Sequence, residues 1–210
     1  MPRHSPRRPV LAELPTLRII GGTKRGRSFH YSGDPRTRPM KDRVREAVFN
    51  LLGPSVKGTH VVDLFAGTGA LGLEALSRGA LHATFFERHF PTAKLIEQNA
   101  ELLELTPQVT VTPGDTFHWA SRFKDPARPW LIFCAPPYDM YLEQAETLQG
   151  LLLHFIAQAP TDSTLVIESD ERWQTEGNLP GEWRTRDYPP ARISILRMDK
   201  SAEVTTPAEA

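Results

Sequence analysis

Apolar and polar positions change along the chain in short blocks that predict strands and helices in alternation. Short apolar runs bounded by glycine, proline or charged residues are typical of buried strands, whereas apolar positions spaced three and four residues apart are typical of helices. The predicted central strands are residues 61–65, 83–87, 109–112, 130–134 and 164–168. The predicted helices are residues 41–52, 70–77, 92–103, 116–122 and 142–158.

The order of these elements predicts the fold class. Strands that alternate with helices require a parallel sheet with right-handed crossover connections. Two further predicted strands, 183–188 and 192–197, follow each other without a helix and indicate an antiparallel edge. We therefore expect an α/β protein with a Rossmann-like, doubly wound, mostly parallel sheet. A hairpin of residues 17–20 and 27–31 is predicted before the first helix.

Composition along the chain predicts four segments. The start is rich in Arg, Pro and Ser, and its apolar run is shorter than a secretory signal requires. The last ten residues lack aromatic side chains and large apolar runs. We expect a disordered leader at 1–16, a basic hairpin and helix at 17–52, a ligand-binding domain at 53–200 and a disordered tail at 201–210.

The charge distribution points to a polyanionic partner. The 210 residues carry 25 Lys and Arg against 25 Asp and Glu, a net charge of +0. Residues 1–45 nevertheless hold twelve basic and three acidic side chains, which is +9 and leaves −9 for the remainder. This separation favours a basic arm that binds a polyanion, with a solvated basic tail as the alternative.

Apolar run lengths and cysteine content exclude other classes of protein. No apolar run approaches the roughly 18 residues of a membrane span, which excludes an integral membrane protein. The single Cys134 excludes an intramolecular disulfide framework and suits a reducing compartment. The seven histidines lack metal-ligand spacing, so we expect no metal site. The expectation is a cytoplasmic protein, monomeric and without a membrane partner.

A glycine turn after the first central strand predicts a nucleoside-type cofactor. Gly67, Gly69 and Gly72 match the spacing of a dinucleotide-binding turn, and Glu87 ends the next strand, where a carboxylate can bind a ribose diol. Asp63 stands directly before the turn, where it would repel a pyrophosphate but attract an ammonium group. This favours S-adenosylmethionine over NAD. A tight turn without a ligand is the structural alternative.

Two further features follow later strands. Asp115 follows the third strand, where it can accept from an adenine amino group or cap the helix that begins at Thr116. After the fourth strand, Pro136 and Pro137 hold an extended backbone with a free carbonyl, and Tyr138 can stack on a flipped base. Cys134 before these prolines is expected to be a core thiol rather than a nucleophile.

These residues resemble the motifs of class I S-adenosylmethionine-dependent N-methyltransferases. The segments 17–27 (LRIIGGTKRGR), 42–46 (DRVRE) and 67–78 (GTGALGLEALSR), with Arg38-Pro39 and Phe49-Asn50, are more specifically similar to the bacterial small-subunit ribosomal RNA guanine-N2 methyltransferase family (RsmD type). The resemblance extends over residues 17–198. It implies methyl transfer to a guanine amine in 16S rRNA, either free or in an assembling 30S subunit.

The resemblance also implies roles for individual residues. The cofactor-binding candidates are Asp63, Phe65, Gly67, Thr68, Gly69, Glu87 and Asp115. The catalytic loop is Ala135, Pro136, Pro137 and Tyr138. The RNA-binding candidates are Arg18, Lys24, Arg25, Arg27, Arg36, Arg38 and Arg43. Arg43 and its neighbour Arg45 have an alternative role as structural partners of acids on the body.

One position departs from the family pattern. The family has Asp or Asn before the two prolines, where its side chain accepts a hydrogen bond from the target amine, and this chain has Ala135. Losing that bond slows a reaction about ten- to a hundredfold. Asp139, directly after Tyr138, is a weaker substitute for the missing acceptor. A weakened methyltransferase is therefore expected. A catalytically silent RNA-binding protein with the same fold is the main alternative.

Overall fold

The computed structural model describes residues 14–34, 37, 39–125 and 127–198. Its strands are β1 (Thr16–Arg18), β2 (Ser28–His30), β3 (His60–Asp63), β4 (His82–Glu87), β5 (Val109–Pro113), β6 (Trp130–Cys134), β7 (Ser163–Ser169), β8 (Trp183–Tyr188) and β9 (Ala191–Met198). Its α-helices are α1 (Asp42–Leu52), α2 (Ala70–Ser77), α3 (Phe90–Leu102), α4 (Thr116–Trp119), α5 (Met140–Glu143) and α6 (Ala145–Gln158). Short 3-10 turns are η2 (Gly53–Val56), η3 (Thr106–Gln108) and η4 (Ala120–Arg122).

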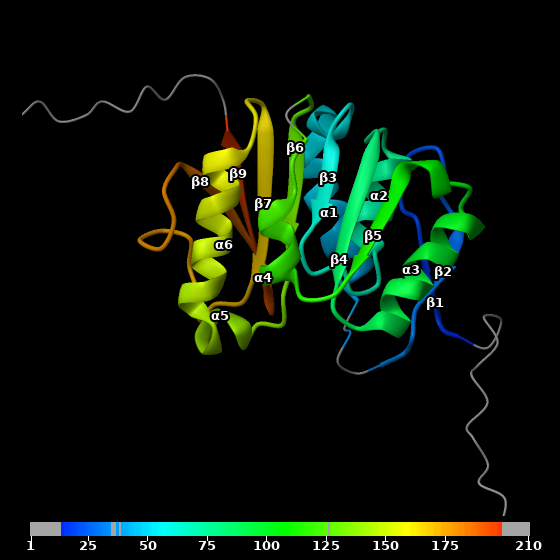
Figure 1. The fold of residues 1–210 in the computed structure, drawn as a ribbon, viewed down its shortest axis with the longest axis horizontal. Helices are drawn as coiled ribbons and strands as arrows, with labels where there is room; N and C mark the ends of the chain where they lie inside the picture. The colour runs from blue at the N-terminus through cyan, green and yellow to red at the C-terminus, as the bar shows by residue number, and fades with distance from the viewer. Residues whose placement is uncertain (1–13, 35–36, 38, 126, 199–210) are drawn as a thin grey trace, which may run out of the picture.

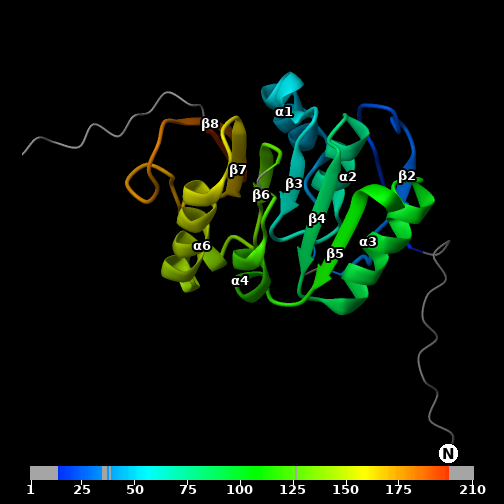
Figure 2. The ribbon, with the colours of Figure 1, turned by 45° about the horizontal axis from the view of Figure 1, so that its top comes forward.

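Seven strands form one sheet in the order β5-β4-β3-β6-β7-β9-β8, which Figure 1 shows from right to left. The first five strands of that order pair in parallel, and β9 pairs antiparallel with β7 and with β8. The parallel strands end at one edge, as the arrowheads of β3, β4 and β5 show in Figure 2. The predicted doubly wound sheet with an antiparallel edge is therefore confirmed.

Helices cover both faces of the sheet and create two hydrophobic clusters. On one face, α1, α2 and α3 pack against alternate strand residues such as Val61, Phe85 and Phe133. On the other face, α5 and α6 pack against the intervening residues, such as Val62 and Ile132. This alternation follows from the two-residue period of a strand. It also means that residues in register at the ends of neighbouring strands direct their side chains to the same face of the sheet.

The predicted N-terminal hairpin is confirmed, and it belongs to the first cluster. β1 and β2 pair antiparallel, with Leu17 opposite Phe29. Ile19 and Phe29 are buried together with Val48 of α1 and Leu73 of α2. The hairpin and α1 therefore share a core with the sheet. The tail at 201–210 and most of the leader at 1–16 lie outside the described residues.

One predicted helix starts at the wrong residue. The helix predicted at 142–158 is α6 over residues 145–158, and the short α5 precedes it, with the two separated at the non-helical Gln144, whose φ is −129°. The first of them, α5, buries Met140 and Tyr141, and α6 buries a stripe that includes Leu148 and Phe155. A single straight helix could not direct both apolar sets into the core. Among the described residues, no helix is long and apolar enough to cross a membrane.

Candidate functional site

The glycine turn connects β3 to α2 at the carboxyl edge of the sheet. Gly67 and Gly69 have φ values of 52° and 75°, in the left-handed region that side chains disfavour. Gly69 is the N-cap of α2, and the Thr68 hydroxyl accepts a hydrogen bond of 3.3 Å from the backbone N–H of Ala70. The turn can therefore bring backbone N–H groups close to a ligand.

Asp63 ends β3 directly before this turn and is almost fully buried. Its Oδ2 accepts no hydrogen bond within the described part of the chain. Burial raises the pKa of Asp63 to about 7, and the charge of Glu87 adds to this shift, whereas the backbone N–H of Gly72 opposes it. A buried carboxylate oxygen without a donor is costly, so this atom fits a cationic donor such as the ammonium group of S-adenosylmethionine.

Glu87 ends β4, on the same face of the sheet as Asp63. Its Oε2 accepts a 2.8 Å hydrogen bond from the N–H of Gly67, and its Oε1 accepts one of 2.8 Å from the N–H of His89. Glu87 therefore holds the glycine turn in place. A carboxylate has about four acceptor positions, so two of them are available to a ribose diol.

The structure gives Asp115 its alternative role as a helix cap. Asp115 is the N-cap of α4, and its Oδ1 accepts a 2.8 Å hydrogen bond from the N–H of Phe117. The residue is exposed. Phe65 packs edge-on against Phe117, with ring centroids 5.9 Å apart. Contact of Asp115 with an adenine stays a prediction.

The Pro-Pro-Tyr loop leaves β6 beside β3. Asp63 is in register with Phe133, so the loop starts two residues beyond the level of that buried acid. Ala135 packs against the first hydrophobic cluster, and Pro136 is buried whereas Pro137 is exposed. The loop thus lies at the carboxyl edge, next to the glycine turn.

Tyr138 is anchored by an acid from the neighbouring strand. Its hydroxyl donates a 2.8 Å hydrogen bond to Oε1 of Glu168, at the end of β7. Asp139 is exposed and forms a 3.0 Å ion pair with Arg172. An acid that is engaged outside the loop in this way is poorly placed to replace the side chain missing at Ala135.

Cys134 is the expected core thiol. It is fully buried in the second cluster. Burial raises its pKa to about 12, so the reactive thiolate is not formed at neutral pH.

Three of the basic RNA-binding candidates are paired with acids, one on α1 and one in the body of the protein. Arg18 Nε lies 2.8 Å from Asp42 Oδ2. Lys24 Nζ and Arg27 Nη1 lie 2.9 and 3.4 Å from the same oxygen of Glu104. The Glu104 side chain is 69% exposed, so solvent screens these pairs. A phosphate can therefore replace Glu104 as their partner.

The remaining candidates differ in how the structure presents them. Arg25 follows the hairpin glycines and Arg43 lies on α1, and both are exposed. Arg36 and Arg38 lie outside the described residues. Exposed guanidinium groups are suited to contacts with a phosphate backbone, which are independent of sequence.

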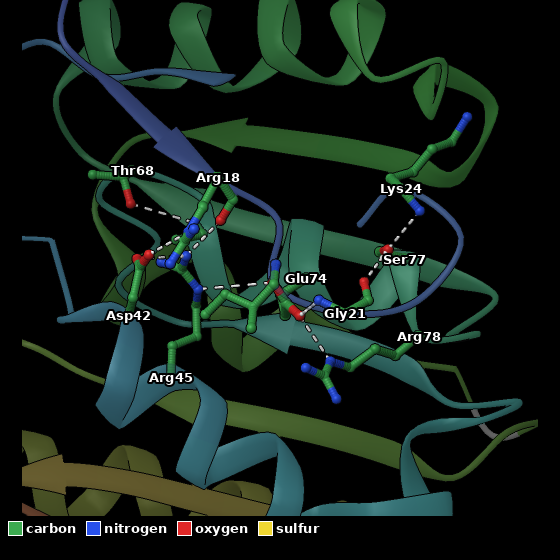
Figure 3. A network of polar contacts seen from close by, with 11 residues as sticks. Arg18, Gly21, Lys24, Asp42, Arg45, Thr68, Glu74, Ser77 and Arg78 are labelled. Atoms are coloured by element: carbon green, nitrogen blue, oxygen red, sulfur yellow. Dashed lines mark hydrogen bonds and ion pairs between the residues drawn. The ribbon is translucent and has the colours of Figure 1, made fainter. Parts of the chain in front are cut away.

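Arg45, whose role the sequence left open, is a structural residue. Its Nε lies 3.8 Å from Oε2 of Glu74 on α2, and both side chains are fully buried. Glu74 also accepts hydrogen bonds of 2.7 Å from the backbone N–H groups of Ile20 and Gly21, and one of 2.8 Å from Arg78 Nε (Figure 3). One buried carboxylate therefore joins α1, the hairpin and α2.

The hairpin is also fastened to the end of α2 by Ser77. The Ser77 hydroxyl donates to the carbonyl of Gly21 at 2.6 Å and accepts from the N–H of Lys24 at 2.9 Å (Figure 3). A side chain at Gly22 would place its Cβ 1.9 Å from the Ser77 carbonyl oxygen, so only glycine allows this approach. The basic segment is therefore held in a defined position relative to the glycine turn.

The chain after the hairpin reaches the glycine turn. Tyr31, Ser32 and Thr37 line a small pocket together with Gly67 and Thr68. This contact connects the basic segment with the glycine turn.

Sequence reasoning missed two acids, and each had a signal. Glu74 is the only charged residue of α2, whose other residues are apolar apart from Ser77 at its end, and such a residue requires a buried partner. Glu168 stands near the end of an apolar strand, at the same edge as Asp63 and Glu87. The sequence indicates that Glu74 and Glu168 are unusual, but only the structure identifies the residues that they contact.

The chain is similar to known proteins over most of its length. The family described as "Conserved hypothetical protein 95" matches residues 17–194. "Ribosomal RNA small subunit methyltransferase D" of Escherichia coli is 46% identical over 78% of this chain and 78% of its own length. YlbH of Bacillus subtilis is 41% identical over 78% of this chain and 89% of its own.

Solved structures agree with this assignment. The structure of yhhF from Escherichia coli has a TM-score of 0.71 and 29% identity, covering 88% of this chain and 99% of that one. An RNA methyltransferase from Salinibacter ruber, solved with S-adenosyl-L-homocysteine, has a TM-score of 0.58 at 17% identity over 79% of this chain and 96% of its own, a likeness of fold. The chain therefore belongs to the ribosomal RNA small subunit methyltransferase D family of class I methyltransferases.

Proposed function

We propose that this protein transfers a methyl group from S-adenosylmethionine to the exocyclic N2 of a guanine in small-subunit (16S) rRNA. The names of its relatives support rRNA as the substrate class. The resemblance of the sequence motifs supports guanine N2 as the target atom. When bound, S-adenosylmethionine supplies an electrophilic methyl group on a sulfonium centre.

The observation that carries the proposal is the buried, unpaired Oδ2 of Asp63 at the carboxyl edge of the sheet. This atom would accept from the ammonium group of the cofactor, and Glu87 would accept from the ribose hydroxyls. A pyrophosphate of NAD at the same place would face the negative charge of Asp63 without a cation to offset it. The acid therefore favours a cofactor with a cationic end.

The RNA would lie over the basic hairpin and α1. Arg25 and Arg43 offer exposed charges there, and Lys24 and Arg27 can exchange Glu104 for phosphate. Because Glu74 and Ser77 fasten the hairpin to α2, the bound RNA would be oriented towards the Pro-Pro-Tyr loop. Tyr138 would then stack on the flipped target base.

Ala135 would make this enzyme slower than one with an acid or an amide at that position. An alanine side chain cannot accept a hydrogen bond from the target amine, so a backbone carbonyl such as that of Pro136 must do so. Ala135→Asp should then raise the methylation rate, by up to about ten- to a hundredfold if the whole bond is restored. A wild type that is already fast and is not accelerated by this change contradicts this part of the proposal.

The direct test is methyl transfer to 16S rRNA and to 30S subunits from a strain that lacks this protein, followed by nucleoside mass spectrometry. N2-methylguanine is the expected product, and a different methylated base contradicts the proposal. Ala135 favours one alternative, a silent RNA-binding protein. Calorimetry with S-adenosylmethionine, combined with this assay, distinguishes the methyltransferase from the silent protein. Cofactor binding without any methylated product on 16S rRNA or 30S subunits indicates the silent protein.

A further inference from the structure

Glu168 lies beside the position where the catalytic loop lacks a side-chain acceptor. β6 and β7 pair in parallel, with Cys134 in register with Ile167. The residues that follow these two are Ala135, directly after the end of β6, and Glu168 of β7, and neighbouring strands lie about 4.8 Å apart. Because Cys134 and Ile167 both point into the second cluster, Ala135 and Glu168 point to the opposite face. That is also the face of Asp63.

Two tyrosines hold Glu168 in place. The Tyr138 hydroxyl donates to its Oε1 at 2.8 Å, and the Tyr141 hydroxyl donates to its backbone carbonyl at 2.8 Å. Within the described residues, no group donates a hydrogen bond to Oε2. Burial raises the pKa of Glu168, and the single bond from Tyr138 offsets this shift only in part. The carboxylate is therefore fixed in position and partly desolvated, and its Oε2 is available to a ligand.

We propose that Glu168 accepts a hydrogen bond from the exocyclic amine of the target guanine, in place of the acid or amide that Ala135 replaces. This inference rests on the proposed function and names a substrate-contacting residue for it. Oε1 orients the stacking ring of Tyr138, and Oε2 accepts from the amine. An acceptor on one N–H of the amine favours a more pyramidal nitrogen, whose lone pair is less delocalised into the ring and more available to the methyl donor. As the N–C bond forms, the C–S bond would break with its electron pair left on sulfur, and the surplus proton of the amine can pass to Oε2.

Guanine and hypoxanthine provide a test that does not depend on turnover. Guanosine 5′-monophosphate carries the amine, whereas inosine 5′-monophosphate lacks it and keeps the N1–H. Binding of each nucleotide to the cofactor-free protein can be measured by NMR titration. We expect wild type to prefer the guanine nucleotide by about ten- to a hundredfold, the range of one hydrogen bond to a carboxylate.

The diagnostic variant is Glu168→Gln, because its amide oxygen still accepts from Tyr138 while its NH2 faces the amine. This variant should lose the preference for guanine, whereas Glu171→Gln, at an exposed acid beyond the end of β7, should keep it. Matching melting temperatures would show that both variants fold. A Glu168→Gln protein that keeps the wild-type preference overturns the inference.

Rescue separates an acceptor from a residue that only positions Tyr138. Glu168→Gln should lower kcat about ten- to a hundredfold and change KM for rRNA less than about twofold, since phosphate contacts dominate RNA affinity. Adding Ala135→Asn should restore most of the lost rate, because its amide oxygen supplies the acceptor without a second negative charge. If Glu168 acts only through Tyr138, Glu168→Gln stays close to wild type, Tyr138→Phe is slow and Ala135→Asn rescues nothing.

The two proposals fail in different ways. If wild type produces no N2-methylguanine, the proposed function is wrong. The preference for the guanine nucleotide over the inosine nucleotide still decides whether Glu168 accepts a hydrogen bond from the amine. If wild type produces N2-methylguanine and Glu168→Gln does so equally fast, only the assignment of Glu168 is wrong.

Discussion

Arg45 Nε lies 3.8 Å from Glu74 Oε2, and neither side chain is exposed to solvent. Arg45 also donates to the Arg18 carbonyl at 2.6 Å and lies 3.1 Å from Asp42 Oδ1. Burial lowers the pKa of Arg45, although Glu74 and Asp42 oppose this shift. The basic N-terminal segment is thus anchored inside the protein by the buried Arg45, whereas Arg25 and Arg43 are exposed.

Removing the Glu74 charge should detach the hairpin. Glu74→Gln removes the fully buried one of the two acids beside Arg45 and leaves only Asp42, and breaking a buried pair costs up to about 3–5 kcal/mol of unfolding free energy. Denaturant unfolding checks the magnitude, and hydrogen exchange at the Ile20 and Gly21 amides checks the location. Glu46→Gln, the same change at an exposed position of α1, should alter stability by less than about 0.5 kcal/mol. Equal stabilities for the two variants would contradict a structural role of Glu74.

Asp63 should make the stability of the cofactor-free protein pH-dependent. In the unfolded chain Asp63 loses its proton near its ordinary pKa of 3.8, but in the folded protein only near 7. Between these values the folded state binds more protons, so this contribution to stability falls as pH rises through the window and is constant above it. Thermal unfolding from pH 4 to 8 should show the decline, and Asp63→Asn should reduce it.

The same group should make cofactor affinity depend on pH in the opposite sense. An ammonium group binds the ionised carboxylate, so affinity should fall about tenfold for each pH unit below about 7. Calorimetry at pH 6 and pH 8, in two buffers of different ionisation enthalpy, measures the affinity and the proton released on binding at pH 6. An affinity that stays constant over this range would contradict contact between Asp63 and the ammonium group.

Gly72 should tolerate no side chain, for a steric reason. A Cβ at this position would lie 2.3 Å from Cε1 of Phe85 in the first cluster. Gly72→Ala should destabilise the fold by about 1–3 kcal/mol and weaken cofactor binding, since the N–H of Gly72 contacts Asp63. Gly150→Ala on α6 is the matched control. It meets no atom within 4 Å and should stabilise the protein by about 0.5–1 kcal/mol.

Arg25 should contribute to RNA affinity through phosphate contact. Arg25→Ala should weaken binding of 16S rRNA fragments irrespective of their sequence and reduce the slope of log K against log salt by about 0.7–0.9. Filter binding between 50 and 300 mM salt measures both. Arg184→Ala, on β8 at the far edge of the sheet, should leave the slope unchanged. A slope that responds equally to both changes would place the RNA elsewhere.

Elements that depend on near neighbours could be predicted from the sequence. The bounds of α2 and β6 agree with the prediction, because the glycine turn begins the helix and prolines flank the apolar strand. The helix predicted at 142–158 is confirmed only from Ala145, because the chain leaves helical geometry at Gln144. Before this break, Tyr141 of α5 packs against Trp173 and donates to the Glu168 carbonyl, and both of these partners are distant in the sequence. Local periodicity does not contain that information.

The sequence by itself determined the sheet, its antiparallel edge, the glycine turn with Asp63 and Glu87, and the segregation of basic residues at the N-terminal end. These follow from apolar periodicity, turn chemistry and charge, which act over a few residues. Only the tertiary structure decided that Arg45 is buried against Glu74 and that Glu168 lies beside Ala135. Those partners are up to tens of residues apart along the chain, and packing of the sheet and helices brings them within bonding distance.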